Sequence, residues 1–214
     1  MVVVIVLYQH QHKGKNMDKT IERRDYEIQN FEIREVDEQR LISGMAVPFN
    51  RQSADLGGFV ERIDPGAVDR TLENSDVVML WQHDSTDPIT RESTGLTLEI
   101  RESGLYFQAD ASDFTERQLD LMDRGVVKQM SFGFVTVSDE WDQTEKPVVR
   151  TLLDIDLREI SPVTWPAYSS TSVAVRSAET AGVELEEKEI DPQVQSNIRK
   201  QKLELLTVEC DFGE

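Results

Sequence analysis

The chain has 214 residues and is strongly acidic, with 41 acidic against 23 basic side chains and a formal net charge of −18 at pH 7. This length suits one domain of ordinary size with additional ends, rather than two full domains. The negative charge would repel phosphate backbones and anionic lipid, so neither nucleic acid nor a membrane is expected as a direct partner. A single cysteine, Cys210, excludes an intrachain disulfide and favours a reducing intracellular setting.

The first residues, MVVVIVLYQHQHKGKN, are interpreted as an unstructured N-terminal extension, residues 1–16. Their apolar run is too short to span a bilayer, no basic region precedes it, and no small-residue cleavage site follows it. Met17 then opens MDKTIERRDYE, which is an ordinary soluble start. His10 and His12 would make at most a weak metal clip, and a flexible tail is the preferred interpretation.

Beyond Met17 the pattern predicts strands with a few short helices. FEIREV alternates apolar and polar residues and is followed, after DEQ, by RLISGMAVPF, so the pair predicts a hairpin. DVVMLWQHD is apolar enough for a central strand, and LTLEI with LYFQAD predicts a second hairpin across RESG. Further strands are expected in VVKQMSFGFVTV, VVRTLLDIDL and SVAV.

Two helices are expected between these strands. In DPGAVDRTLENS, Asp64 is the predicted N-cap and Pro65 the first helical residue. In SDFTERQLDLMDRG, Ser112 or Asp113 is the predicted cap and Gly125 ends the helix. The expected fold is therefore mainly β with a few helices, most economically a mainly antiparallel sheet that closes or nearly closes into a barrel.

From residue 178 onwards the composition changes. Residues 178–214 hold ten acidic and four basic side chains and only one aromatic residue, so this segment cannot build a core of its own. It is interpreted as an acidic linker and tail, with a possible helix at residues 191–206 that begins near Pro192. The folded domain is accordingly expected to span residues 17–177.

The chemistry depends first on His83, which is the only histidine outside the N-terminal extension. A lone histidine is most often structural, and no second histidine or cysteine in the domain could share a metal with it. The sequence therefore predicts no metal site and no cofactor. The remaining question is whether His83 serves a nucleophile.

Ser131 is the candidate nucleophile, in the apolar stretch KQMSFGF. A serine on a strand commonly satisfies its hydroxyl on the backbone, but Gly133, two positions further on, would leave space on the same face for a substrate or an opposing backbone. Glu159, in REISPVTWPAY, is the candidate for orienting the imidazole; the alternative is a surface carboxylate paired with Arg158 or Arg150. Asp84 and Asp156 remain alternative third groups.

The order of DPGAV, LWQHD, a hairpin, a helix, KQMSFGF and REISPVTWPA resembles the prohead maturation protease family of tailed bacteriophages. The resemblance covers about residues 30–177. It implies a serine protease related in fold to the herpesvirus assemblins, with His83 as catalytic histidine, Ser131 as nucleophile and Glu159 as the acidic third member. Phage proteases commonly carry a Gly-Arg pair after the histidine segment, where this chain has PITRESTG, and this departure bears on substrate contacts.

The function expected from the resemblance is a serine endopeptidase that processes the major capsid protein or its scaffolding segment inside the assembling prohead, in the host cytoplasm, and that cleaves itself. A homo-oligomer is also expected. The alternative is a non-enzymatic, scaffold-like assembly factor with the same fold, but the presence of both His83 and Ser131 favours the enzyme. An esterase of the G-x-S-x-G type is not supported, because no such motif surrounds Ser131.

Overall fold

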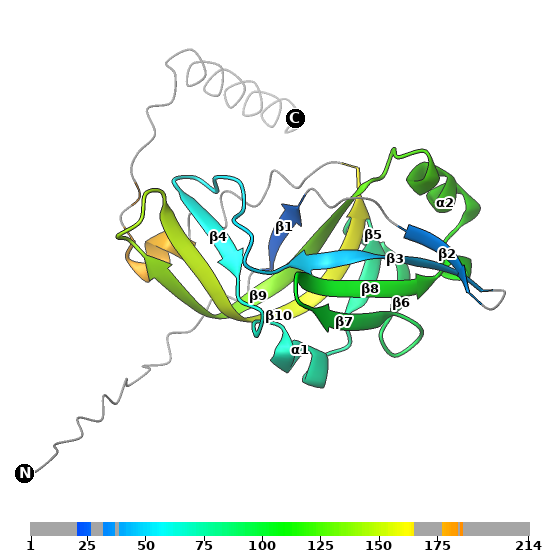
Figure 1. The fold of residues 1–214 in the computed structure, drawn as a ribbon, viewed down its shortest axis with the longest axis horizontal. Helices are drawn as coiled ribbons and strands as arrows, with labels where there is room; N and C mark the ends of the chain where they lie inside the picture. Colours follow the sequence, from blue (N-terminus) through cyan, green and yellow to red (C-terminus); the bar gives the residue numbers. More distant parts are fainter. Residues whose placement is uncertain (1–20, 27–31, 37–38, 165–176, 184, 186–214) are drawn as a thin grey trace, which may run out of the picture.

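The computed structural model describes residues 21–26, 32–36, 39–164, 177–183 and 185. Figure 1 shows the arrangement of its elements. In chain order these are β1 (Glu22–Tyr26), β2 (Glu32–Val36), β3 (Gln39–Pro48), β4 (Phe59–Ile63), α1 (Asp69–Asn74), β5 (Val78–Trp81), β6 (Asp84–Arg91), β7 (Thr97–Arg101), β8 (Gly104–Asp110), the 3-10 helix η1 (Ala111–Asp113), α2 (Glu116–Asp123), β9 (Gln129–Asp142) and β10 (Val148–Val163).

The first sheet has the strand order β1-β9-β10-β5-β6, and β4 pairs with the first part of β10. β9 and β10 form its centre as a long antiparallel pair of 14 and 16 residues (Figure 1). β1 lies antiparallel on the other side of β9, with Arg23 opposite Gly133 and Asp25 opposite Ser131. The predicted nucleophile therefore lies on an inner strand, between β1 and β10.

The second sheet has the order β2-β3-β8-β7 and is antiparallel throughout. Its apolar face packs against that of the first sheet in one core, which includes Phe107 from β8 and Phe132 and Phe134 from β9. The core-facing residues alternate along β9, so Ser131 and Gly133 face the opposite side from Phe132 and Phe134. This alternation separates the apolar core from the face that carries the candidate site.

The segment around α1 fills a gap in the ladder of β10. β4 pairs with β10 at Val148–Leu152 and β5 pairs with it at residues 159–160, both in parallel. Between these two stretches, the buried Thr71 hydroxyl donates to the carbonyl oxygen of Ile155 (2.6 Å) and accepts from the backbone N–H of Leu157 (3.0 Å). α1 thus supplies hydrogen bonds to β10 in the stretch where neither β4 nor β5 pairs with it. The chain then continues into β5, which pairs with β10 beside Glu159.

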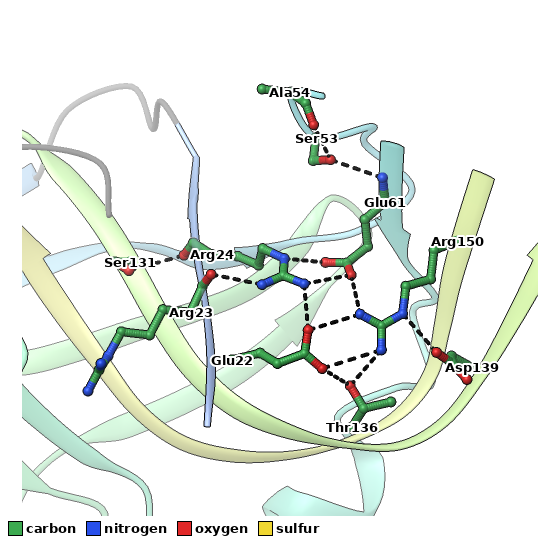
Figure 2. Close-up of polar contacts among 10 residues, drawn as sticks. All are labelled: Glu22, Arg23, Arg24, Ser53, Ala54, Glu61, Ser131, Thr136, Asp139 and Arg150. Atoms are coloured by element: carbon green, nitrogen blue, oxygen red, sulfur yellow. Dashed lines mark hydrogen bonds and ion pairs between the residues drawn. The ribbon is translucent and has the colours of Figure 1, made fainter. Parts of the chain in front are cut away.

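A buried ion cluster attaches β1 to the rest of the sheet (Figure 2). Arg24 donates to Glu61 (2.8 Å) and Glu22 (2.7 Å), and Arg150 donates to the same two carboxylates, at 2.9 Å to each. All four side chains are at most 5% exposed. Because a buried charge without a partner is very costly, these contacts fix the place of β1 against β9 and β10.

The structure confirms a mainly β chain with few helices, but the expected barrel closure is wrong. In the described residues both sheets are open: β1, β6 and the short β4 are outer strands of one sheet, and β2 and β7 are outer strands of the other. The sheets bury their apolar faces against each other instead, so closure is not needed to form a core. The pairing is mainly antiparallel, with β4 and β5 running parallel to β10.

Both predicted hairpins are present, as β2–β3 and β7–β8, whereas both predicted helix starts are wrong. Asp64 caps a turn through the N–H of Gly66, and α1 begins only at Asp69. α2 begins after Thr115, which forms a capping box with Gln118, while Gly125 follows its end with φ of 68°, as expected. β1, β4 and β6 were not predicted.

A second, smaller apolar cluster includes residues beyond the composition change. Ala178 and Val183 are buried against Phe59 and Val148, and residues 177–181 are helical. The expected strand SVAV, the extension at residues 1–16 and the possible helix at 191–206 lie outside the described residues. The domain limits of 17 and 177 stay predictions.

Candidate active site

His83 lies in the two-residue turn between β5 and β6. The backbone of Gln82 and of His83 has positive φ, 56° and 62°, a conformation that residues other than glycine rarely adopt. The turn is held by Gln82, whose N–H donates to the carbonyl oxygen of Pro162 (3.2 Å) and whose amide exchanges two hydrogen bonds with Thr164. Strained backbone that its surroundings fix in this way is typical of functional sites.

A β-bulge sets the direction of Glu159. Leu157 lies opposite Phe134 and Glu159 lies opposite Gly133, so Arg158 is the extra residue of β10 at this point. In a regular strand without the bulge, Glu159 would follow Leu157 by two positions and share its core side. The bulge therefore turns the carboxylate to the face that carries Ser131.

The imidazole and the carboxylate meet directly. Nδ1 of His83 lies 2.7 Å from Oε1 of Glu159, and both side chains are largely buried. The neighbouring acids are engaged elsewhere: Asp84 accepts from Thr86, and Asp156 from Arg158. Glu159 is therefore the acid that contacts His83, and the alternative pairing of Glu159 with Arg158 or Arg150 is not found.

The space left by Gly133 is occupied by Glu159. A Cβ built on Gly133 would lie 2.5 Å from Oε1 of Glu159, which is closer than any such contact allows. The sequence suggested that this glycine makes room for a substrate or a backbone. The structure shows instead that it makes room for a carboxylate from the next strand.

Ser131 is completely buried, and its hydroxyl donates to the carbonyl oxygen of Arg24 on β1 (3.1 Å; Figure 2). Its register partner on β10 is Ser161, so both serines and Glu159 share one face of the β9–β10 pair. Nε2 of His83, the ring nitrogen that does not face Glu159, is buried and has no hydrogen-bond partner. The structure thus leaves one basic nitrogen unsatisfied on the residue predicted to act as base.

Two further residues of the site were not found from the sequence. Ser161 donates to Oε2 of Glu159 at 2.6 Å, and Nε of Arg23 lies 3.4 Å from Oε1. Figure 2 shows Arg23 on the opposite side of β1 from Glu22 and Arg24, as strand alternation requires. For Ser161 the signal was present, because it follows Glu159 by two positions on a strand.

The charged side chains in this region form two separate groups, namely the contacts of Glu159 described above and the ion cluster on the other side of β1. In the ion cluster, burial alone would raise the pKa of Glu22, but the guanidinium groups of Arg150 and Arg24 outweigh burial and hold that pKa at about 2. Glu22 and Arg24 lie on the opposite side of β1 from Arg23, the residue of β1 that contacts Glu159, so their side chains hold β1 in place and do not contact His83. Within the described part of the chain there is no cluster of three or more potential metal ligands and no helix that could cross a membrane.

A buried carboxylate on one nitrogen of a histidine is the pairing that orients the base in serine hydrolases. Ser131 lies on β9, beside the strand that carries Glu159, and its hydroxyl bonds to Arg24 and not to His83. The model of the caudovirus prohead serine protease family matches residues 29–186, which is well over half of the chain, and the protein belongs to that family. Membership implies a serine protease that acts on phage capsid proteins inside the assembling prohead. No curated protein and no solved structure gave a match.

Proposed function

We propose that the chain is a capsid maturation endopeptidase in which Ser131 is the nucleophile, His83 the general base and Glu159 the residue that orients His83. The observation that carries the proposal is the contact of Nδ1 of His83 with Glu159 (2.7 Å), together with the unpartnered Nε2. Glu159 accepts the Nδ1 proton, so the lone pair of the neutral ring lies on Nε2. That tautomer is the one a base for serine needs.

In the proposed reaction, Oγ of Ser131 attacks the carbonyl carbon of a peptide bond while its proton passes to Nε2 of His83. The leaving amine then takes this proton, which gives an acyl-enzyme, and a water activated by His83 hydrolyses the ester. In the described structure the hydroxyl of Ser131 donates to Arg24. The first step therefore includes a rotation of the Ser131 side chain away from β1, consistent with the loose catalytic contacts of many substrate-free enzymes.

The proposed substrates are the major capsid protein, or its scaffolding segment, and the chain itself. The segment after residue 178 is acidic and poor in aromatic residues, which favours exposure to a protease. From its composition, the linker between about Arg176 and Glu189 is the expected place of self-cleavage. Since Ala178 and Val183 are buried and Leu185 packs against the same cluster, we propose the part after residue 185 as the cleaved stretch. Before self-cleavage, the intact tail is proposed to act as a tag that brings the enzyme into the prohead. The enzyme is proposed to be a homo-oligomer.

The central experiment is Ser131→Ala in the full-length chain, co-expressed with the capsid protein of the same phage. We expect no cleavage of either chain, because loss of one member of a Ser-His unit costs on the order of a millionfold in turnover. Ser138→Ala is the matched control, since Ser138 is an exposed serine on the same strand, and it should cleave normally. Full cleavage by a folded Ser131→Ala variant would contradict the assignment of Ser131 as nucleophile, whereas a folded wild-type chain that cleaves neither protein would favour a non-enzymatic assembly factor.

A further inference from the structure

We propose that Ser161 is a positioning residue that fixes the carboxylate of Glu159 for His83. This inference rests on the proposed function of the same site. Ser161 is completely buried and donates its hydroxyl proton to Oε2 of Glu159 at 2.6 Å. A short hydrogen bond to a charged acceptor is among the stronger interactions available to a serine.

The two oxygens of Glu159 have separate donors. Oε1 faces Nδ1 of His83 at 2.7 Å, with Arg23 more distant at 3.4 Å, while Oε2 accepts from Ser161. A glutamate has three side-chain torsions, and a single contact through Oε1 would leave the carboxylate free to turn about it. The bond from Ser161 removes this freedom, so Oε1 stays directed at the imidazole.

The strand register explains why Ser161 can do this. Ser161 follows Glu159 by two positions on β10, so both side chains project to the same face. Across the strand pair, Ser161 lies opposite Ser131 and Glu159 lies opposite Gly133. The carboxylate is therefore enclosed by the bare backbone of Gly133 below and by the hydroxyl of Ser161 beside it.

The simpler explanation is that Ser161 only satisfies a buried carboxylate. The chain provides a direct comparison, because Thr136 donates to Oε1 of Glu22 at the same 2.6 Å within the ion cluster. Both hydroxyls stabilise a buried glutamate, but the carboxylate of Glu159 also contacts a histidine. A structural role predicts similar consequences for the two hydroxyls, whereas a positioning role predicts that only Ser161 affects catalysis.

The test measures how fast diisopropyl fluorophosphate modifies Ser131 in the full-length chain, followed by intact mass and peptide mapping. In this reaction Oγ bonds to phosphorus, fluoride leaves and the serine proton passes to His83, so the rate reports activation of the serine without a protein substrate. Ser161→Ala should react about ten- to a hundredfold more slowly, the effect expected for loss of a hydrogen bond to a charged group. Thr136→Val should react at the wild-type rate.

A double-mutant cycle with Glu159→Gln separates positioning from packing. If Ser161 acts through Glu159, adding Ser161→Ala to Glu159→Gln should slow the reaction by less than about twofold, because the interaction is already lost. In turnover of capsid protein, Ser161→Ala should lower kcat and leave KM unchanged. If Ser161→Ala does not fold, as judged by circular dichroism, Ser161→Cys replaces it in the cycle with the same criteria.

Two results would overturn the inference alone: a Ser161→Ala variant that reacts at the wild-type rate, or one that loses the same factor with and without Glu159. Wild-type chain that is modified elsewhere than at Ser131 would instead remove the proposed function, and this inference with it.

Discussion

The buried carboxylate of Glu22 makes the stability of this protein depend on pH in a calculable way. Its pKa of about 2 lies below the 4.5 of a free glutamate, because Arg150 and Arg24 outweigh the opposing effect of burial. A carboxyl group whose pKa is lowered on folding stabilises the folded state above the unfolded pKa, and this contribution is lost as pH falls towards the folded pKa. Replacing Glu22 by glutamine removes the titration and keeps the shape.

The size of the effect follows from the shift. At pH 7 the full difference of about 2.5 pKa units corresponds to about 3 kcal/mol of folding free energy. At pH 3, between the two pKa values, about 2 kcal/mol of this is lost, and most of the remainder is lost between pH 3 and pH 2. We therefore expect Glu22→Gln to be about 3 kcal/mol less stable than wild type at pH 7 and only about 1 kcal/mol less stable at pH 3.

Urea denaturation of both proteins at the two pH values measures this difference. Glu99→Gln is the control, because Glu99 and its partner Arg101 are more than half exposed, at 60% and 56%, and such pairs contribute under about 1 kcal/mol. A difference between wild type and Glu22→Gln that stays constant from pH 7 to pH 3 would refute the reasoning. It would mean that Glu22 is not ionised against the two arginines in the folded state.

Three further predictions concern single positions. Gly133→Ala should reduce proteolysis by more than tenfold, because its Cβ would displace the Glu159 carboxylate; kinetics at the wild-type rate would contradict this. Arg150→Met should lower the unfolding free energy by about 3–5 kcal/mol, since it leaves Glu61 and its neighbours with too little positive charge, and a loss below 1 kcal/mol in urea would be inconsistent. Thr115→Ala should cost about 1 kcal/mol through loss of the capping box, with activity unchanged; a stability equal to wild type would show that the cap is dispensable.

Features that depend on neighbours in sequence were predictable. The β2–β3 and β7–β8 hairpins follow from the alternation of apolar and polar residues and from short turns. Gly125 follows the end of α2 because glycine readily adopts the positive φ needed there. The start of α1 was missed because Asp64 makes an equally good cap for a turn. Closure into a barrel was not predictable, since the same alternation also suits two stacked open sheets.

Strands whose stability comes from distant residues were missed. β1 reads ERRDY, a charged stretch, and is a strand because Glu22 and Arg24 find Arg150 and Glu61. β6 reads DSTDPITR, which is polar and contains Pro88, a residue tolerated on an outer strand.

The candidate site was anticipated in part. The resemblance brought His83, Ser131 and Glu159 together as candidates, and the structure places His83 against Glu159. The role of Gly133 was misread, because no local rule says that a bulge at Arg158 directs a carboxylate over it. Of the partners of Glu159, Ser161 could have been found from the period-2 spacing on β10, but Arg23 reaches Glu159 through the pairing of β1, β9 and β10, which composition and periodicity do not specify.

The position of β1 also has a consequence for how a nascent chain acquires this fold. Glu22 leaves the ribosome early, yet its partner Arg150 lies 128 residues further along, and β9 is made only shortly before Arg150. Until then β1 has no sheet to join, and its charges remain hydrated. Docking of β1 is thus a late, long-range step that closes a large loop. In pulsed hydrogen exchange during refolding, the amides of β1 should become protected after those of the β7–β8 hairpin.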